Sequence, residues 1–203
     1  MEDKFFDRHS PIYETKGNLP HWNQRGKITF ITFRLADSIP QNVIKDFIIE
    51  EKVWRTNHPF PVNGEIEEWM RRRHNRIELY LDSGAGRCVL KESKCRHIIE
   101  TALKFIDGTR CIIHSYVIMP NHIHLLIEPI GEWNIQNIVG AIKKYTAREI
   151  NIIYRRHGRL WRKEYFDRII RNEKHYIAVL DYIKYNPRNC DKGEFTYYTA
   201  VKW

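Results

Sequence analysis

Two periods of apolar and polar residues run along this chain, and they predict its secondary structure. Residues 27–35 (KITFITFRL) alternate apolar residues with hydroxyl or basic residues, which is typical of a strand. Residues 111–119 and 122–128 are two further apolar runs, and the tight Pro-Asn turn between them predicts an antiparallel hairpin. Residues 164–171 (EYFDRIIR) predict a last strand.

Longer segments have apolar residues at every third or fourth position and predict helices. The predicted helices cover residues 41–54, 65–81, 94–106, 134–153 and 173–185. The first two are separated by the turn-rich NHPFPVNG and form a helical hairpin inserted at about 38–83. Asn186-Pro187 ends the last helix, because the residue before a proline disfavours helical backbone.

Without the inserted hairpin, the element order is strand, helix, strand, strand, helix, strand, helix. This order predicts an α+β fold with a ferredoxin-like split βαβ antiparallel sheet and helices on one face, followed by a C-terminal helix. The 203 residues suit a single domain over residues 1–203, with the inserted helical region after the first strand. This fold supports many functions, so the chemistry of individual residues has to decide.

Charge and composition narrow the class of partner. The chain has 34 Lys and Arg against 25 Asp and Glu, a net charge of +9, which favours a polyanionic partner; a solvated basic surface explains the same excess equally well. No apolar run approaches the roughly 20 residues that span a membrane, and MEDKFFDR lacks a signal-peptide core. The four cysteines have no paired spacing, so we expect a cytoplasmic protein without a disulfide framework or zinc finger.

His122 and His124 begin the second strand of the predicted hairpin. Residues i and i+2 of a strand share a face about 6.6–7 Å apart, so both imidazoles can converge on one metal ion. Ile123, Leu125 and Ile127 then fill the opposite, buried face. Packed core histidines are the alternative explanation, and a metal site needs at least one further ligand.

Tyr182 and Asn186 offer the missing chemistry on the last helix. They are four residues apart, hence on one helical face, next to His175 and Ala178. The apolar stripe of this helix is expected at Ile177, Leu180 and Ile183. An amide oxygen from Asn186 would complete a nitrogen and oxygen ligand set suited to Mg²⁺ or Mn²⁺. The phenol of Tyr182, with an ordinary pKa of about 10, is then a candidate nucleophile beside the ion.

Tyr145 and Glu149 form a rival pair with the same spacing. Glu149 would be a harder oxygen ligand than an amide. However, Tyr145 continues the apolar face of Ile135, Ile138 and Ile142, which suits a packed tyrosine. Spacing favours Tyr182 over Tyr145 without excluding either.

Basic residues are concentrated in a segment of 21 positions. They are Lys143, Lys144, Arg148, Arg155, Arg156, Arg159, Arg162 and Lys163. Such side chains attract phosphates, and the interleaved Tyr145, Tyr154 and Trp161 could stack on unpaired bases. We expect the basic residues to bind DNA and Trp161 to anchor the segment to the core.

Three further motifs make a family resemblance specific. MPNHIHLLIEP (119–129), LWRKEYFDRIIR (160–171) and DYIKYNP (181–187) occur in this order and resemble the single-tyrosine HUH transposases. Among these, the chain is most similar to the REP-associated tyrosine transposases of bacteria. LPHW (19–22) with ITFITFRLA (28–36), and LDSGAGRCVL (81–90), resemble one branch of that family.

The resemblance implies a metal-dependent reaction on single-stranded DNA near hairpins. His122 and His124 would be the ligands of Mg²⁺ or Mn²⁺, and Asn186 would help to complete the site. Tyr182 would attack a phosphodiester, giving a 5′-phosphotyrosine link and a free 3′-hydroxyl, and the same site could rejoin a second end. Relatives include monomers and homodimers, so either state is expected.

Some features differ from many relatives. Trp161-Arg162-Lys163 stands where many have Trp-Gln, and the helical hairpin at 41–81 is missing from the most compact members. Its Arg71-Arg72-Arg73 run either contacts DNA or is a solvated helix face. Two alternative functions stay open: a non-catalytic ferredoxin-like nucleic-acid-binding protein, and a metal-dependent hydrolase that uses water.

Overall fold

The computed structural model describes residues 2–15, 21–62 and 64–201. The chain forms two compact units, one from residues 1–36 and 89–203 and the other from residues 37–88. The larger unit contains the sheet, and the smaller unit is helical. No helix in the described part of the chain is long and apolar enough to cross a membrane.

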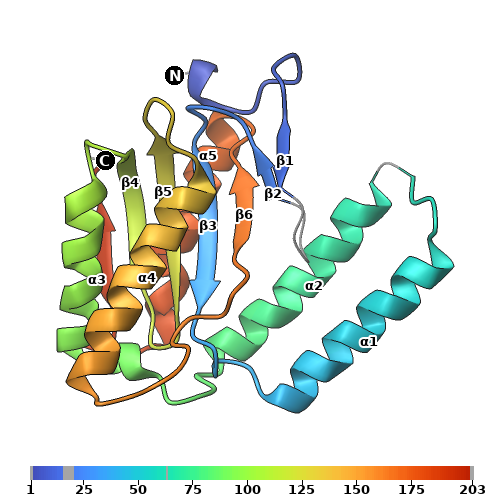
Figure 1. The fold of residues 1–203 in the computed structure, drawn as a ribbon. Helices are drawn as coiled ribbons and strands as arrows, with labels where there is room; N and C mark the ends of the chain where they lie inside the picture. Colours follow the sequence, from blue (N-terminus) through green and yellow to red (C-terminus); the bar gives the residue numbers. More distant parts are fainter. Residues whose placement is uncertain (1, 16–20, 63, 202–203) are drawn as a thin grey trace. The chain divides into compact units, whose positions relative to one another are not determined.

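Five strands form an antiparallel sheet in the order β6-β3-β5-β4-β7 (Figure 1). The strands are β3 (Thr29–Arg34), β4 (Cys111–Ile118), β5 (His122–Pro129), β6 (Phe166–Ile169) and β7 (Thr196–Thr199). β3 and β4 run parallel with β5 between them, and β5 and β6 run parallel with β3 between them. These two interlocked split βαβ units confirm the predicted ferredoxin-like sheet.

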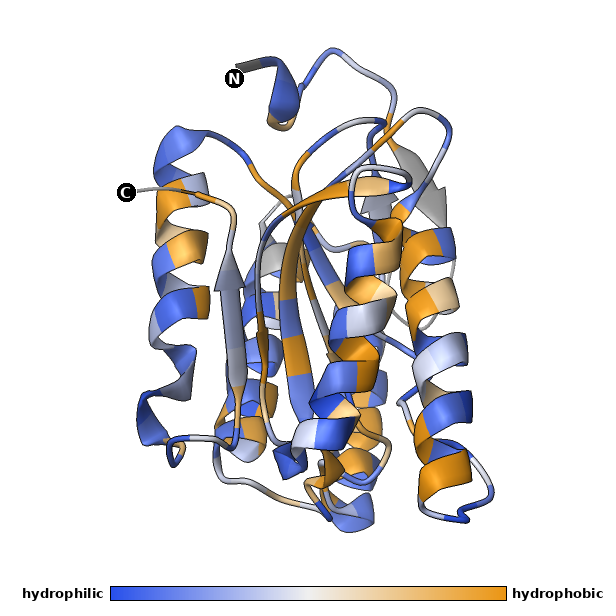
Figure 2. Cartoon of the chain, turned by 90° about the vertical axis from the view of Figure 1, so that its left-hand side faces the viewer, coloured by the Kyte–Doolittle hydropathy of each residue, from blue (hydrophilic) through white to orange (hydrophobic). Residues whose placement is uncertain are grey.

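Helices cover both faces of this sheet. α3 (Ser93–Ile106) and α4 (Ile135–Ile153) pack on one face, where Ile31 and Leu125 belong to the core. α5 (Glu173–Tyr185) packs on the other face, against Phe30 and Leu126. Figure 2 shows the apolar sides of helices turned toward the strands from both directions. β3 and β5 are therefore buried on both faces along nearly their whole length, because each face of the sheet has its own helical cover.

Several short elements were not predicted. β1 (Tyr13–Thr15) pairs with β2 (His21–Asn23) in a separate two-stranded sheet, and residues 16–20 between them lie outside the described residues. β7 pairs with β4, and the rings of Tyr116 and Tyr198 stack 5.1 Å apart. The described residues of this unit also include the 3₁₀ turns η1 (Glu2–Lys4), η2 (Val89–Lys91) and η3 (Asn186–Asn189).

The smaller unit is the predicted helical hairpin of α1 (Gln41–Asn57) and α2 (Glu65–Asp82). The indoles of Trp54 and Trp69 stack 5.1 Å apart, and Glu51 bonds Arg73 at 2.7 Å across the two helices. Arg71 and Arg72 both pair with Glu68 of their own helix. All three arginines of the predicted run therefore have acidic partners within this unit.

Candidate functional site

β5 presents its two histidines to the α5 side of the sheet. Ile123 and Leu125 point into the core under α3 and α4, as predicted, so the residues between them point the other way. His122 and His124 are fully buried there, at 0% exposure. The ring of His124 stacks on Phe30, with ring centroids 5.6 Å apart.

The two imidazoles converge through their Nε2 atoms, which lie 2.9 Å apart. His122 Nδ1 is 2.7 Å from the Asn121 Oδ1, which can only accept, so His122 donates from Nδ1 and keeps a lone pair on Nε2. His124 Nδ1 is 2.8 Å from the Thr32 hydroxyl, which can accept in the same way. Two facing lone pairs repel, so either a cation or a shared proton has to lie between the Nε2 atoms.

Burial keeps His122 neutral. Its desolvation, assisted by the positive charge of Arg34, lowers the pKa of His122 to about 3. A neutral imidazole is the form that binds a metal ion. The hydrogen bonds that the imidazoles donate to Asn121 and Thr32 also fix the orientation of both rings, as outer partners of metal-binding histidines do.

α5 brings Tyr182 to these histidines. The helix begins at a cap in which Asn172 Oδ1 accepts from the backbone N–H of His175 at 2.9 Å. The Tyr182 hydroxyl lies 3.4 Å from His124 Nε2, and its ring meets Phe30 edge-on at 5.8 Å. Tyr182 remains 38% exposed, so part of its side chain is open to solvent.

One detail of the predicted α5 pattern is wrong. Ile177 is 42% exposed, and the buried stripe consists of Tyr176, Val179, Leu180 and Ile183. The helix is rotated relative to the expected stripe because Tyr176, whose hydroxyl lies 2.8 Å from His114 Nδ1, fills the place next to the sheet.

Asn186 follows Tyr182 by one helical turn, and its backbone N–H donates to the Tyr182 carbonyl. Its side-chain Oδ1 is buried and has no hydrogen-bond partner in the described part of the chain. A buried amide oxygen normally has a partner. This amide oxygen and the two imidazole nitrogens are donor types that a divalent cation such as Mg²⁺ or Mn²⁺ accepts.

The rival pair lies on the other face of the sheet. Tyr145 and Glu149 belong to α4, which packs on the face opposite to the two histidines. Tyr145 is 38% exposed, so it is not the packed tyrosine that the pattern suggested. Glu149 binds Arg148 at 2.7 Å. The face of the sheet, and not burial, distinguishes Tyr182 from Tyr145.

Five of the eight predicted DNA-binding residues line one cavity of about 590 Å³ between α4 and residues 158–165. They are Lys143, Lys144, Arg159, Arg162 and Lys163. Arg148, Arg155 and Arg156 are not part of its lining. We call this cavity the α4 groove.

Trp161 anchors the wall of the α4 groove, as expected. It is 3% exposed, its indole N–H donates to Thr146 Oγ1 at 2.9 Å, and its ring packs edge-on against Phe33 at 5.0 Å. The following residue continues the sheet, because the Arg162 N–H donates to the carbonyl of Arg34 at 2.9 Å. The basic wall is therefore held by the core.

A buried contact between a histidine and a carboxylate, which the sequence did not indicate, lies beside the α4 groove, whose lining includes His21. His21 Nδ1 lies 2.6 Å from Asp167 Oδ1, and His21 stacks on Tyr165 with centroids 4.3 Å apart. Burial opposes protonation of His21, but Asp167, and to a lesser degree Glu164, outweigh it and raise the pKa of His21. His21 and Asp167 are 146 positions apart, so no local spacing could have revealed the pair.

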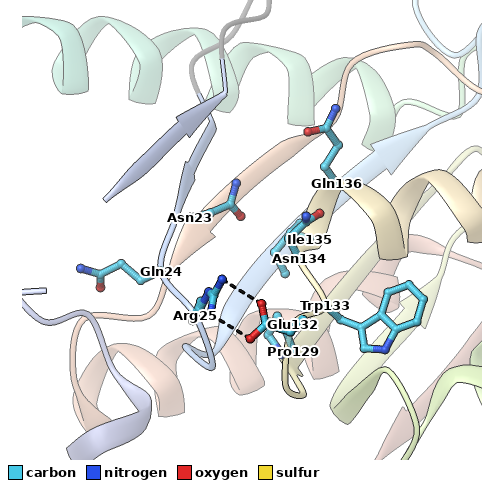
Figure 3. Close-up of a pocket in the computed structure, with 9 residues that line it drawn as sticks. All are labelled: Asn23, Gln24, Arg25, Pro129, Glu132, Trp133, Asn134, Ile135 and Gln136. Atoms are coloured by element: carbon cyan, nitrogen blue, oxygen red, sulfur yellow. Dashed lines mark hydrogen bonds and ion pairs between the residues drawn. The ribbon is translucent and has the colours of Figure 1, made fainter. Parts of the chain in front are cut away.

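A smaller cavity of about 230 Å³ lies where the loop after β2 meets the start of α4. Figure 3 shows Arg25 and Glu132 beside it, joined by two contacts of 2.8 Å. Gln24, Asn134 and Gln136 contribute amides to its lining. An exposed ion pair and amides provide neither a nucleophile nor a metal site, so the chemistry belongs to the histidine and tyrosine cluster.

The sheet presents a histidine pair to a tyrosine of α5, and a known family of proteins matches the segment that contains these residues. Residues 86–186 match the family model described as "Transposase IS200 like", a segment that includes both histidines, Tyr182 and Asn186. The chain belongs to the IS200-like transposase family.

Two individual proteins are similar to the chain. An uncharacterized protein of Haemophilus influenzae (strain ATCC 51907 / DSM 11121 / KW20 / Rd) is 33% identical over 96 residues, covering 37% of this chain and 53% of that protein. The chain thus matches about half the length of this relative. A solved structure of a REP-associated tyrosine transposase bound to a REP hairpin has a TM-score of 0.49 and 17% identity, over 85% of this chain and 73% of that one.

Proposed function

We propose that the protein cleaves and rejoins single-stranded DNA near hairpins, with Tyr182 as nucleophile and Mg²⁺ or Mn²⁺ as cofactor. The observation that carries the proposal is the 3.4 Å distance between the Tyr182 hydroxyl and His124 Nε2, at the point where both imidazoles converge. Membership of the IS200-like transposase family supports the same reaction.

His122, His124 and Asn186 would hold the cation. The imidazoles supply two Nε2 lone pairs, and the unpaired Asn186 Oδ1 supplies a hard oxygen. When bound, a divalent ion stabilises the charge that builds on a phosphate under attack. Thr32 and Asn121 hold the two imidazole rings in this orientation by accepting hydrogen bonds from the Nδ1 atoms of His124 and His122.

Tyr182 would carry out the transfer. Its phenolic oxygen attacks the phosphorus, the bond from phosphorus to the 3′ oxygen breaks, and the phenolic proton is lost to solvent while the 3′ oxygen gains one. The products are a 5′-phosphotyrosine and a free 3′-hydroxyl. Attack of a 3′-hydroxyl on the phosphotyrosine reverses every step, so a second strand end can be joined without a nucleotide cofactor.

The basic segment of α4 and the following connection would bind the DNA. The five cations of the α4 groove lie in one unit with the two histidines, and Arg148, Arg155 and Arg156 add charge near them in sequence. Electrostatic attraction to phosphates dominates the affinity of such surfaces. A hairpin with single-stranded flanks is the substrate that this proposal names.

Covalent capture tests the reaction. The protein is incubated with Mn²⁺ and synthetic single strands that carry palindromes from the DNA flanking its gene, labelled at either the 3′ or the 5′ end. We expect the 3′ label to move with the protein on a denaturing gel and the 5′ label to appear in a shorter free strand, because the tyrosine retains the 5′ phosphate.

Matched tyrosine variants decide the assignment. Tyr182→Phe should abolish the adduct, whereas Tyr185→Phe, on the same helix and 59% exposed, should form it normally. Cleavage without an adduct, unaffected by Tyr182→Phe, would mean that water is the nucleophile. DNA binding without cleavage of any substrate would mean a non-catalytic binding protein.

A further inference from the structure

A second polar cluster lies on the α5 face of the sheet, farther along β5 than the two histidines. Glu128 is 6% exposed and shares this face with Leu126, because residues two positions apart in a strand point the same way. His114 of β4 is the extra residue of a β-bulge, since the register of β4 with β5 shifts between Ile113 and Ser115. A bulge re-aims a side chain, and His114 is turned toward α5.

Tyr176 of α5 meets this histidine. Its hydroxyl lies 2.8 Å from His114 Nδ1, and the two rings meet edge-on, with centroids 5.5 Å apart. Glu128 Oε2 lies 3.6 Å from His114 Nε2, and the ammonium of Lys4 pairs with the same carboxylate. The ring of Phe5 packs on Tyr176 with centroids 6.3 Å apart. A chain of polar groups therefore runs from the N-terminal turn η1 through two strands to α5.

The protonation of the cluster fixes the direction of its central hydrogen bond. Burial is the main cause that lowers the pKa of His114, and it outweighs the opposite effect of Glu128, so the imidazole is neutral. Burial also raises the pKa of Tyr176, so the phenol keeps its proton. The negative carboxylate of Glu128 favours the imidazole proton on Nε2. The Tyr176 hydroxyl therefore donates to Nδ1 of His114.

This hydrogen bond constrains α5 in a way that its apolar contacts do not. Val179, Leu180 and Ile183 also pack toward the sheet, but apolar packing is non-directional. A hydrogen bond, in contrast, weakens steeply when its angle changes. Tyr176 precedes Tyr182 by six residues, or about 9 Å along the helix axis. A rotation of α5 at the first tyrosine is therefore carried to the second.

The Tyr182 hydroxyl is sensitive to small rotations of α5. A helix with its side chains has a radius of about 6 Å, so rotation by about 10° moves a side-chain tip by about 1 Å. The hydroxyl lies 3.4 Å from His124 Nε2, so such a movement changes its place at the site substantially. Misplacement of a reacting group by about 1 Å can slow a reaction about 100-fold.

We propose that His114 is a positioning residue for the cleavage reaction. By accepting a hydrogen bond from Tyr176, it holds the rotation of α5 that directs the Tyr182 hydroxyl at the converging imidazoles. Glu128 and Lys4 support it by fixing the imidazole. The inference rests on the proposed function, because it concerns the geometry of the nucleophile that this function assigns.

Removing one hydroxyl tests the inference. Tyr176→Phe keeps the ring between Phe5 and His114 but cannot donate. Adduct formation is followed in single turnover, with the full chain in excess over a labelled hairpin strand and with saturating Mn²⁺. The rate constant should fall at least about tenfold, because the Tyr182 hydroxyl is no longer held in place. Affinities for the same strand, by anisotropy, and for Mn²⁺, by isothermal titration, should stay within about twofold of wild type.

Matched variants separate positioning from stability, with all rates measured well below each variant's melting temperature. His114→Asn places an amide oxygen near the position of Nδ1, so it should restore most of the wild-type rate. His114→Leu offers no acceptor and should react as slowly as Tyr176→Phe. Tyr116→Phe also removes a hydroxyl from a buried tyrosine, 5% exposed, but on the face of α3 and α4. It should react at the wild-type rate.

Two results would overturn the inference and leave the catalytic assignment standing. One is a Tyr176→Phe protein that forms the Tyr182 adduct at the wild-type rate. The other is a Tyr176→Phe protein that loses DNA or Mn²⁺ affinity by the same factor as its rate, which would indicate general damage to the structure. Absence of any adduct in the wild type would instead contradict the proposed function, and this inference with it.

Discussion

Thr32 should control metal affinity although it is not a ligand. Thr32 is 5% exposed and stands opposite His124 in the β3 and β5 register, and its hydroxyl lies 2.8 Å from His124 Nδ1. In the metal-bound form the hydroxyl accepts from Nδ1, which leaves the lone pair of Nε2 for the ion. Thr32→Val keeps the shape but removes this acceptor.

The expected effect follows from the tautomer of His124. Without the acceptor, metal binding leaves a buried N–H unpaired, whereas the metal-free protein can move that proton to Nε2 and donate it to His122 across the 2.9 Å gap. The variant therefore favours the metal-free form. Loss of such an outer partner weakens metal binding by about 10- to 100-fold, or about 1.4–2.7 kcal/mol.

Isothermal titration of the full chain with Mn²⁺ measures this difference. Thr29→Val is the matched control: it is also a buried threonine of β3, 2% exposed, but its hydroxyl donates to the Lys27 carbonyl at 3.1 Å, away from the histidines. Both variants should lose about 1 kcal/mol of unfolding free energy. Equal Mn²⁺ affinity in the two variants would refute the proposed role of Thr32.

Three further predictions concern charge. Burial lowers the pKa of Lys143 to about 8, so this side chain loses its positive charge as the pH rises from about 7 to about 9. Affinity for single-stranded DNA, measured by fluorescence anisotropy, should fall over the same range. Lys143→Arg, which stays charged, should show a smaller fall. The logarithm of that affinity should decrease with the logarithm of salt concentration with a slope near −3.5 if all five groove cations meet phosphates; a flat dependence would make the charge incidental. Arg96→Met should lower the unfolding free energy by about 3 kcal/mol, because it removes the guanidinium that donates to the Leu90 and Gly193 carbonyls. Denaturant titrations measure this difference, and an unchanged midpoint would show that these hydrogen bonds contribute little.

The secondary structure of the sheet and its helices could largely be predicted from the chain. Strand and helix periods are local properties, since a buried face repeats every two residues in a strand and every three to four in a helix. The same logic placed both histidines on one face of β5 and placed Tyr182 one turn before Asn186. The exposed Ile177 shows the limit, because apolarity alone does not fix how a helix is rotated on its sheet.

Other features depend on contacts that no local pattern records. β7 is a strand only because β4 offers it an edge, and the pKa of His21 is raised because the distant Asp167 lies beside it. The choice between Tyr182 and Tyr145 also required the fold, since both have the same spacing and the same exposure. The topology of the fold places α5, with Tyr182, on the sheet face that carries the two histidines, and α4, with Tyr145, on the opposite face.

The sequence by itself therefore determined which groups are available: two imidazoles on one strand face, a phenol and an amide on one helix face, and a cluster of cations. The tertiary structure decided how these groups meet, with Nε2 atoms 2.9 Å apart and the phenol at 3.4 Å. The physical reason is that periodicity fixes the direction of a side chain relative to its own element, while distances between elements depend on how the whole core packs.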